Sequence, residues 1–264
     1  MYHTHWGLRT SPFGSEAGSS TNANAGFDEA LARLKYLLDQ RGHLGLLLGS
    51  AGTGKTTLAK RFCEEARRQG SLSALIGGKG CTENSFVQQL ARGWLLALGE
   101  DGSDDWERIA DRLIELRYER AAAVVALDDA DLASAKVLCQ VERLLHLALN
   151  ADSHLTIVLV SSLESAANLG SALLEQVELR IDLSPWSEDE TAEHVALRLF
   201  HSGSDSPIFT DEAITALHEL SGGIPRKVEQ IAQLALLAGA GQQLTEIDAL
   251  TLTEAYQELG VGGL

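Results

Sequence analysis

The sequence predicts an α/β fold: a parallel sheet with helices on both faces, followed by a small all-helical domain. Short apolar runs of strand length alternate with stretches of helical periodicity through the first 184 residues, and only helical periodicity continues beyond them. Strands separated by helix-length segments are typical of a parallel sheet that is covered on both sides. The length of 264 residues suits one large or two small domains. We therefore expect two domains, residues 1–184 and residues 185–264.

The expected elements follow one another in a regular order. After a Gly-, Ser- and Asn-rich segment at residues 14–26, helical periodicity begins at Phe27. We expect strands at 44–48, 72–76, 123–127, 155–160 and 178–183, and helices at 56–69, 85–98, 106–119 and 135–149. In the helical domain we expect breaks at 203–207, 222–225 and 239–241, where Gly and Pro cluster.

The chain is acidic. It holds 21 Lys and Arg against 37 Asp and Glu, a formal net charge of −16. Residues 185–264 contribute 3 basic and 13 acidic side chains, a net charge of −10, which leaves 18 and 24, or −6, for residues 1–184. Such a field repels nucleic acid and anionic lipid unless a local basic patch overrides it. One cluster on the 56–69 helix merits attention as a DNA contact: Lys60, Arg61, Arg67 and Arg68. Since Glu64 and Glu65 interrupt it, a solvated helix face is the better interpretation.

The cysteines and apolar runs indicate the compartment. Cys63, Cys81 and Cys139 are far apart and lack the spacing of a zinc site or a disulfide framework. No apolar run approaches the roughly 18 residues of a membrane span, and the start lacks the layout of a signal peptide. We expect a cytoplasmic protein in a reducing environment, with no membrane span of its own.

A glycine-rich loop carries the strongest functional signal. Residues 49–56, Gly49-Ser50-Ala51-Gly52-Thr53-Gly54-Lys55-Thr56, fit the pattern GxxxxGK[ST] between an apolar strand and a helix. Such a loop folds its backbone N–H groups around phosphates at the positive end of the helix. We expect this loop and Thr57 to bind ATP or ADP. Lys55 should reach the β- and γ-phosphates, and Thr56 should place its hydroxyl on Mg²⁺.

Two carboxylates close the apolar strand at 123–127. Asp128 is the candidate metal ligand, and Asp129 is the candidate for orienting or deprotonating the attacking water. Asp129 is one methylene shorter than the glutamate usual there, so hydrolysis is expected to be slow. The alternative is that Asp129 and Asp131 are solvated loop acids. Ser161, in the Ser161-Ser162 pair after the next strand, is a candidate hydroxyl near the γ-phosphate, although serine pairs at strand ends are common.

With these features in place, the chain resembles the AAA+ ATPases. The resemblance is to the branch of ExeA or general secretion pathway A proteins, with the TniB and TnsC transposition ATPases as cousins. It spans nearly the whole chain. The matching segments are Tyr2, Trp6-Gly7-Leu8, Ser11-Pro12-Phe13, Phe27-Asp28-Glu29-Ala30-Leu31, Phe209-Thr210-Asp211-Glu212-Ala213 and Gly222-Gly223-Ile224-Pro225-Arg226.

The resemblance implies a P-loop NTPase of the AAA+ type, with the nucleotide held between a five-stranded α/β domain and a helical lid. It also implies assembly into a homo-oligomeric ring or filament. Arg226 matches the lid arginine that contacts the γ-phosphate. Arg180 falls where an interface arginine reaches a neighbouring subunit's phosphate, although a surface salt bridge is the alternative. The chain departs from the family between Phe13 and Phe27, which lacks the usual proline-containing aromatic stretch, so adenine contacts are expected near Pro12-Phe13 and the lid.

Three functions are compatible with these features. The leading one is an ATPase that uses Mg²⁺ and couples its nucleotide state to remodelling or regulation of a protein partner, with a secretion-related role implied by the resemblance. The second is a transposition-type regulator whose ATP-bound filament coats DNA, which the acidity disfavours. The third is a nucleotide-sensing scaffold that hydrolyses ATP slowly.

Overall fold

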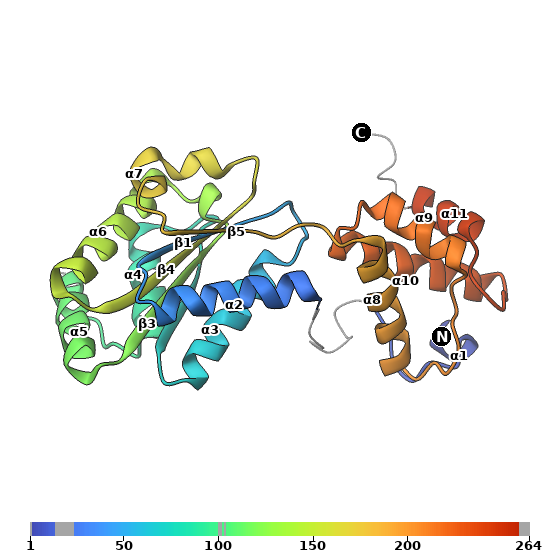
Figure 1. Ribbon diagram of the computed structural model, residues 1–264, viewed down its shortest axis with the longest axis horizontal. Coiled ribbons are helices and arrows are strands. Elements are labelled where there is room, and N and C mark those ends of the chain that lie inside the picture. The colour runs from blue at the N-terminus through green and yellow to red at the C-terminus, as the bar shows by residue number, and fades with distance from the viewer. Residues whose placement is uncertain (1, 14–23, 100–101, 103, 259–264) are drawn as a thin grey trace. The chain divides into compact units, whose positions relative to one another are not determined.

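The computed structural model describes residues 2–13, 24–99, 102 and 104–258 (Figure 1). Most of the Gly-, Ser- and Asn-rich segment, residues 14–23, lies outside the described residues. The chain divides into two compact units. The sheet unit comprises Gly26–Ser50 and Gly54–Leu183, and the helical unit comprises Met1–Ala25, Ala51–Thr53 and Ser184–Leu264.

The sheet unit is built on five parallel strands in the order β2-β3-β4-β1-β5. The strands are β1 (Leu44–Leu48), β2 (Leu72–Gly77), β3 (Ala122–Asp128), β4 (His154–Ser161) and β5 (Leu179–Asp182). All five expected strands are confirmed to within one residue at either end. Because the strands are parallel, their carboxyl ends lie along one edge of the sheet, with the end of β4 between those of β1 and β3.

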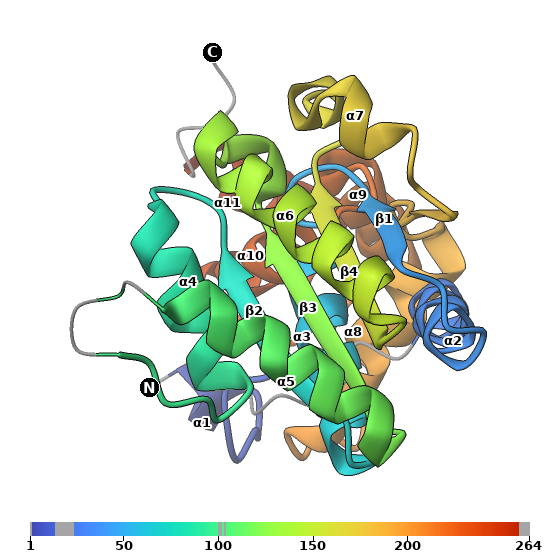
Figure 2. The same cartoon turned by 90° about the vertical axis from the view of Figure 1, so that its left-hand side faces the viewer.

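Helices cover both faces of this sheet. The helices of the unit are α2 (Ala25–Asp39), α3 (Lys55–Arg68), α4 (Glu83–Gly93), α5 (Asp105–Glu119), α6 (Ala135–Ala151) and α7 (Ser171–Leu174), with the short 3₁₀ turns η1 (Ala130–Leu132) and η2 (Ala166–Leu169). Side chains alternate along each strand. Leu47 therefore packs with α2 and α3 on one face, while Leu46 and Leu48 pack with α4, α5 and α6 on the other. Figure 2 shows α4, α5 and α6 in front of the sheet.

Helix α4 ends earlier than the sequence predicts. Helical periodicity predicts a helix to residue 98, but α4 ends at Gly93. A Cβ atom at Gly93 would lie 2.5 Å from the Cβ of Ala74, so the helix packs on β2 at a distance that only glycine permits. Leu95 then adopts a φ of 54°, which ends the helix.

The helical unit contains four main helices: α8 (Glu188–His201), α9 (Asp211–Ser221), α10 (Pro225–Gly241) and α11 (Ala249–Glu258). Ser187 forms a capping box at the start of α8. The breaks predicted at 203–207 and 222–225 are confirmed, but the break at 239–241 is wrong, because α10 continues to Gly241. A Cβ at Gly239 would lie 2.8 Å from Cζ2 of Trp6, so this glycine admits an aromatic ring rather than ending the helix.

The N-terminal segment belongs to the helical unit. Trp6 Nε1 donates a hydrogen bond to Leu236 O (2.8 Å), and Leu8 and Phe13 are buried in the core formed by α8 to α11. The division at residue 184 predicted from the sequence places residues 1–25 with the sheet, whereas Met1–Ala25 group with Ser184–Leu264. The physical reason is that these apolar side chains complete a small core that four helices leave unfilled.

The position of Phe13 makes a testable prediction about this core. Phe13 has no exposed surface, so Phe13→Ala should destabilise the helical unit by about 3–5 kcal/mol. Hydrogen exchange read by mass spectrometry should show faster exchange in α8 to α11 and unchanged exchange in β1 to β5. The control is Phe200→Ala, which removes a ring that is 67% exposed and should change stability by less than about 0.5 kcal/mol. Equal protection of α8 to α11 in both variants would contradict the assignment.

Candidate functional site

The glycine-rich loop joins the end of β1 to the start of α3. Gly52 and Gly54 have φ angles of 90° and 101°, a left-handed conformation that disfavours any side chain. Gly54 occupies the N-cap position of α3 and has no side chain with which to cap it. The N–H groups of the first turn of α3 therefore receive no side-chain acceptor from the N-cap residue. These donors and the positive end of the helix dipole favour the binding of an anion.

Lys55 is the first residue of α3 and folds back over this loop. Its Nζ donates hydrogen bonds to Gly49 O (2.7 Å) and Ser50 O (3.0 Å). Partial burial lowers the pKa of Lys55, while nearby carboxylates oppose that shift, with Asp131 the strongest of them. The ammonium is held only by neutral carbonyl oxygens of its own loop. It can therefore exchange these partners for phosphate oxygens without breaking an ion pair.

Asp128 ends β3 and is half-buried beside the start of α3. Burial raises the pKa of Asp128, whereas hydrogen bonds from the Thr56 hydroxyl and the Asp129 N–H lower it. Its Oδ1 atom is buried and accepts no hydrogen bond from any residue that the structure describes. Buried polar atoms without a partner are rare and call for an explanation. Mg²⁺ prefers oxygen ligands, so this atom and the adjacent Thr56 hydroxyl fit a metal held together with a phosphate.

Asp129 turns the chain out of the sheet. It is exposed and has φ 48° and ψ 45°, a left-handed conformation that Asp tolerates better than most residues. This conformation ends β3 and begins η1. It places Asp129 at the surface next to the metal candidate Asp128.

The end of β4 differs from the expectation. Ser161 is buried, and its hydroxyl donates to Ser162 O (2.9 Å). The Ser162 hydroxyl instead donates to Asp131 Oδ2 (3.0 Å), which ties the β4 end to η1 after β3. Asn168 Nδ2 adds a long contact to Asp131 O (3.5 Å). Asp131 is therefore a bonded link between two strand ends and not a solvated loop acid. No local sequence signal reveals it, because the link depends on β3 and β4 being neighbours.

Gly78, just after β2, is a further residue of the site that the sequence does not indicate. Its N–H donates to Asp128 O (2.6 Å), and a Cβ at this position would lie 2.5 Å from Asp129 O. The backbone of the acidic strand end is thus supported by a glycine of the neighbouring strand. Only glycine allows this approach.

The two candidate arginines come from β5 and from the helical unit, where the N–H of Arg226 donates to Gly52 O of the phosphate loop (3.3 Å). Arg180 on β5 is exposed and makes a forked ion pair with Asp182 on the same strand, with Nη2 to Oδ1 at 2.8 Å. This pairing corresponds to the surface salt bridge named as its alternative. Arg226 is exposed in the first turn of α10, in the helical unit. Of the expected site residues, the sheet unit thus brings together Lys55, Thr56 and Asp128, with Asp129 beside them.

The basic cluster on α3 is partly neutralised. Glu65 makes ion pairs with Arg61 (2.9 Å) and Lys35, and Arg67 donates to Ser73 O (3.2 Å). The predicted solvated face agrees with this arrangement. Among the described residues, no three His, Cys, Asp or Glu side chains are placed to hold a metal ion by themselves, and no helix has the length and apolar content for a membrane crossing.

The cysteines show no sign of cross-linking or activation. Cys63, Cys81 and Cys139 are free thiols. Burial raises the pKa of Cys63 to about 11, so it stays protonated and unreactive at neutral pH.

Gly78 lies so close to the backbone of Asp128 and Asp129 that adding one methyl group there should destabilise the protein. Gly78→Ala would force the backbone of the acidic strand end to shift and should cost about 1–3 kcal/mol in the free energy of unfolding. Gly77→Ala is the matched control, because a Cβ there would meet nothing within 4 Å. Urea-induced unfolding followed by circular dichroism measures both. A destabilisation of the same size in both variants would contradict the packing described.

Comparison with known proteins agrees with this geometry. The AAA domain family matches residues 38–169, which run from the end of α2 through η2. General secretion pathway protein A of Aeromonas hydrophila is 31% identical over 90% of this chain, and the chain spans 45% of that protein's length.

Solved structures with a similar fold include Cdc6p of Pyrobaculum aerophilum, with a TM-score of 0.71, 18% identity and coverage of 92% of this chain and 70% of that one. They also include the ORC2 protein of Aeropyrum pernix in ADPNP and ADP complexes, with a TM-score of 0.66, 18% identity and coverage of 87% and 66%. The phosphate loop, the acidic strand end and the family match lead to one conclusion: the chain belongs to the AAA domain family and has the AAA+ fold.

Proposed function

We propose that the chain binds ATP together with Mg²⁺ and hydrolyses it, coupling the nucleotide state to assembly with itself and with a protein partner. The observation that carries this proposal is the buried and unpartnered Oδ1 of Asp128 beside Thr56 and Lys55. This oxygen is already removed from water but has no hydrogen-bond partner. It would gain a partner when Mg²⁺ binds together with the phosphates.

Each group has a role in this proposal. Backbone N–H groups of residues 49–54 and of the first turn of α3, through Thr57, surround the phosphates. Lys55 moves from the carbonyl oxygens of Gly49 and Ser50 to the β- and γ-phosphates. The Thr56 hydroxyl and Asp128 would hold Mg²⁺, which supplies positive charge to the phosphate oxygens.

The charges of the site explain why a metal is needed. Four carboxylates act on Lys55, those of Asp131, Asp129, Asp128 and Glu164. One lysine does not offset four acids and the several negative charges of ATP. We therefore expect the binding of ATP to depend strongly on a divalent cation. This dependence should be stronger than at a site with fewer acidic side chains.

Hydrolysis is assigned to Asp129, with support from the link between β3 and β4. Asp129 is exposed and can reach a water, but its side chain is short, so turnover is expected to be slow. The Ser162–Asp131 hydrogen bond fixes the β4 end relative to the acidic strand, so Ser162 replaces Ser161 as the proposed hydroxyl on the γ-phosphate side.

The arginines extend the proposal beyond the sheet unit. The first turn of α10 contains Arg226 and Lys227 and no acidic residue, although a helix N-terminus favours acids. Positive charge placed against the helix dipole is well suited to an anionic ligand, which supports Arg226 as a phosphate contact. Arg180 acts on a neighbouring subunit only if it leaves Asp182, so we propose it as an arginine released by assembly.

The biological role follows from the relative's name alone. General secretion pathway protein A is a curated relative, which supports a secretion-related role with a protein partner. A DNA-coating function is disfavoured, because the net charge is −16 and the basic cluster on α3 is partly paired.

Removal of the lysine tests nucleotide binding. Lys55→Ala should weaken binding of a fluorescent ATP analogue on the order of 100-fold, because one or two charge-assisted hydrogen bonds are lost. Lys60→Ala is the matched control, since Lys60 is an exposed lysine on the same helix. Fluorescence anisotropy in the presence of Mg²⁺ measures both. Equal affinities of the two variants would show that the site is elsewhere.

Changes at the acidic strand end separate binding from hydrolysis. Asp128→Asn should bind nucleotide with less dependence on Mg²⁺ and should lose phosphate release, because the neutral amide is a poor ligand for Mg²⁺. Asp129→Glu should raise turnover, since the longer side chain reaches the water more readily. Phosphate release assays with saturating ATP measure both effects. Turnover of Asp128→Asn at the wild-type rate would refute the assignment.

A further inference from the structure

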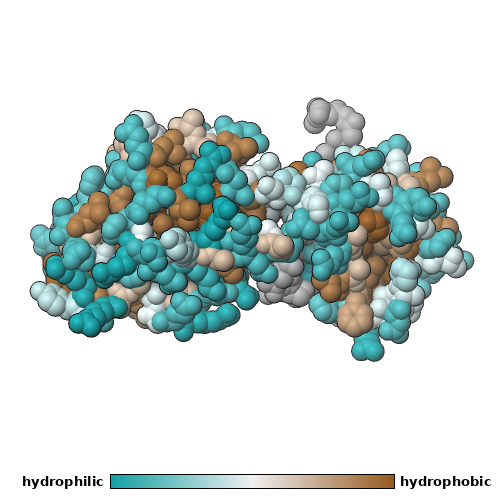
Figure 3. Space-filling view, viewed as in Figure 1, coloured by the Kyte–Doolittle hydropathy of each residue, from teal (hydrophilic) through white to brown (hydrophobic). Residues whose placement is uncertain are grey.

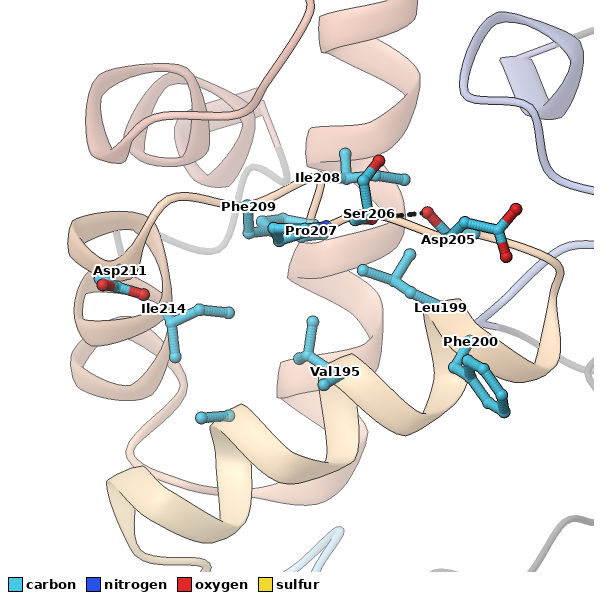
Figure 4. A pocket seen from close by; sticks show the side chains of 13 residues that line it. Val195, Leu199, Phe200, Asp205, Ser206, Pro207, Ile208, Phe209, Asp211 and Ile214 are labelled. Atoms are coloured by element: carbon cyan, nitrogen blue, oxygen red, sulfur yellow. Dashed lines mark hydrogen bonds between the residues drawn. The ribbon is translucent and has the colours of Figure 1, made fainter.

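The helical unit carries an apolar groove that takes no part in the proposed nucleotide chemistry. It encloses about 440 Å³ between α8, α9 and the loop at 204–210. Side chains from both helices and from the loop line it, among them Val195, Leu199, Ile208, Phe209 and Ile214, and Figure 4 shows Phe200 at its edge with the ring turned away from them. Its volume lies within the range of ligand and anchor pockets in proteins.

Apolar side chains form most of the lining of the groove, and one side of the groove is open to solvent. Val195 and Leu199 are buried in its floor, while the ring of Phe200 is 67% exposed at its edge. In the space-filling view, apolar side chains gather on the helical unit over the region between α8 and α9 (Figure 3). An exposed phenylalanine beside a preformed apolar groove is unfavourable in water and typical of a surface that a partner covers.

The charge around the groove indicates the chemistry of that partner. Asp205 and Asp211 lie on the groove itself, and no Lys or Arg is among the residues that line it. Arg198 on α8 is buried and donates to Glu229 (3.0 Å), so it does not offset these acids. The side chain of Arg9 packs on Gly203, just before the loop at 204–210, and Arg9 is not among the lining residues. Acidic residues therefore dominate the rim.

We propose that this groove receives a segment of a partner protein that inserts apolar side chains and flanks them with Lys or Arg. Apolar anchors would fill the groove and displace water from Phe200, and the basic flanks would pair with the rim. A second copy of this chain fits less well, because residues 185–264 carry a net charge of −10 and would repel one another. The inference goes beyond the proposed ATPase, because it uses none of the nucleotide-site residues.

Three labelled peptides of equal length test the proposal on the full chain by fluorescence anisotropy. One is an amphipathic peptide of leucine and lysine, one replaces lysine with glutamate, and one replaces leucine with serine. We expect the leucine–lysine peptide alone to bind, with an affinity that falls as salt rises, because both anchors and charges contribute.

Two pairs of variants localise the binding. Ala196 is exposed and lines the groove, so the larger side chain of Ala196→Trp should fill it. This variant should bind the leucine–lysine peptide about tenfold or more weakly than the wild type does. Leu197→Trp, one residue along α8 and outside the lining, should bind as the wild type does. Asp205→Lys should also weaken binding, whereas Glu254→Lys, at an exposed acid on α11, which contributes no residue to the lining, should not. Thermal unfolding and binding of the fluorescent ATP analogue confirm that each variant is folded.

The outcomes discriminate clearly. Equal binding of the leucine–lysine peptide to Ala196→Trp and Leu197→Trp would overturn the proposal. So would binding of the serine–lysine peptide with the same affinity, which indicates charge alone, or of the leucine–glutamate peptide, which indicates a groove for any apolar ligand. Loss of a dimer in sedimentation of Ala196→Trp would assign the groove to a second copy and would also overturn it. Failure of ATP binding in the wild type would affect the proposed function and leave the groove untouched.

Discussion

The position of β4 between β1 and β3 is the constraint on which the candidate site depends. Pairing of Leu48 with Ser161 and of Leu127 with Leu159 sets the ends of these strands at one edge of the sheet. The phosphate loop, the two acids and the serine pair therefore meet, although they are separated by long stretches of sequence. The hydrogen bond from Ser162 to Asp131 then converts this neighbourhood into a defined contact. A shift in the register of β4 against β1 or against β3 would separate these groups.

A second consequence of this arrangement is electrostatic. The edge holds one lysine among four carboxylates, and burial penalises the charge of both Lys55 and Asp128. Such a site is poorly suited to a bare polyphosphate and well suited to one that arrives with a divalent cation. The sheet sustains the cost of burying Asp128 without a partner for Oδ1, and the proposed metal would relieve that cost. The acidity of residues 185–264 is a separate property, and two of these acids, Asp205 and Asp211, line a groove that contains no phosphate-binding loop.

Much of the fold could be predicted from sequence, because apolar runs of strand length and helical periodicity are local properties. The strands, the phosphate loop and the carboxylates after β3 belong to this class. Other features depend on contacts between distant segments. Asp131 gains its partner through strand order, Gly78 supports the backbone of Asp128 from the neighbouring strand, and Gly239 resembles a helix break until Trp6 is placed beside it. The burial of Phe13 among α8 to α11 likewise cannot be predicted from the local sequence pattern around Phe13.

The central claim is that Asp128 and Thr56 hold the metal of a bound nucleotide. A crystal structure of the chain with a non-hydrolysable ATP analogue and Mn²⁺, read by anomalous scattering, tests it most directly. We expect a manganese peak bonded to Asp128 Oδ1 and the Thr56 hydroxyl, with Lys55 moved from Gly49 O to the phosphates. A nucleotide bound elsewhere, or a manganese peak away from Asp128, would contradict it.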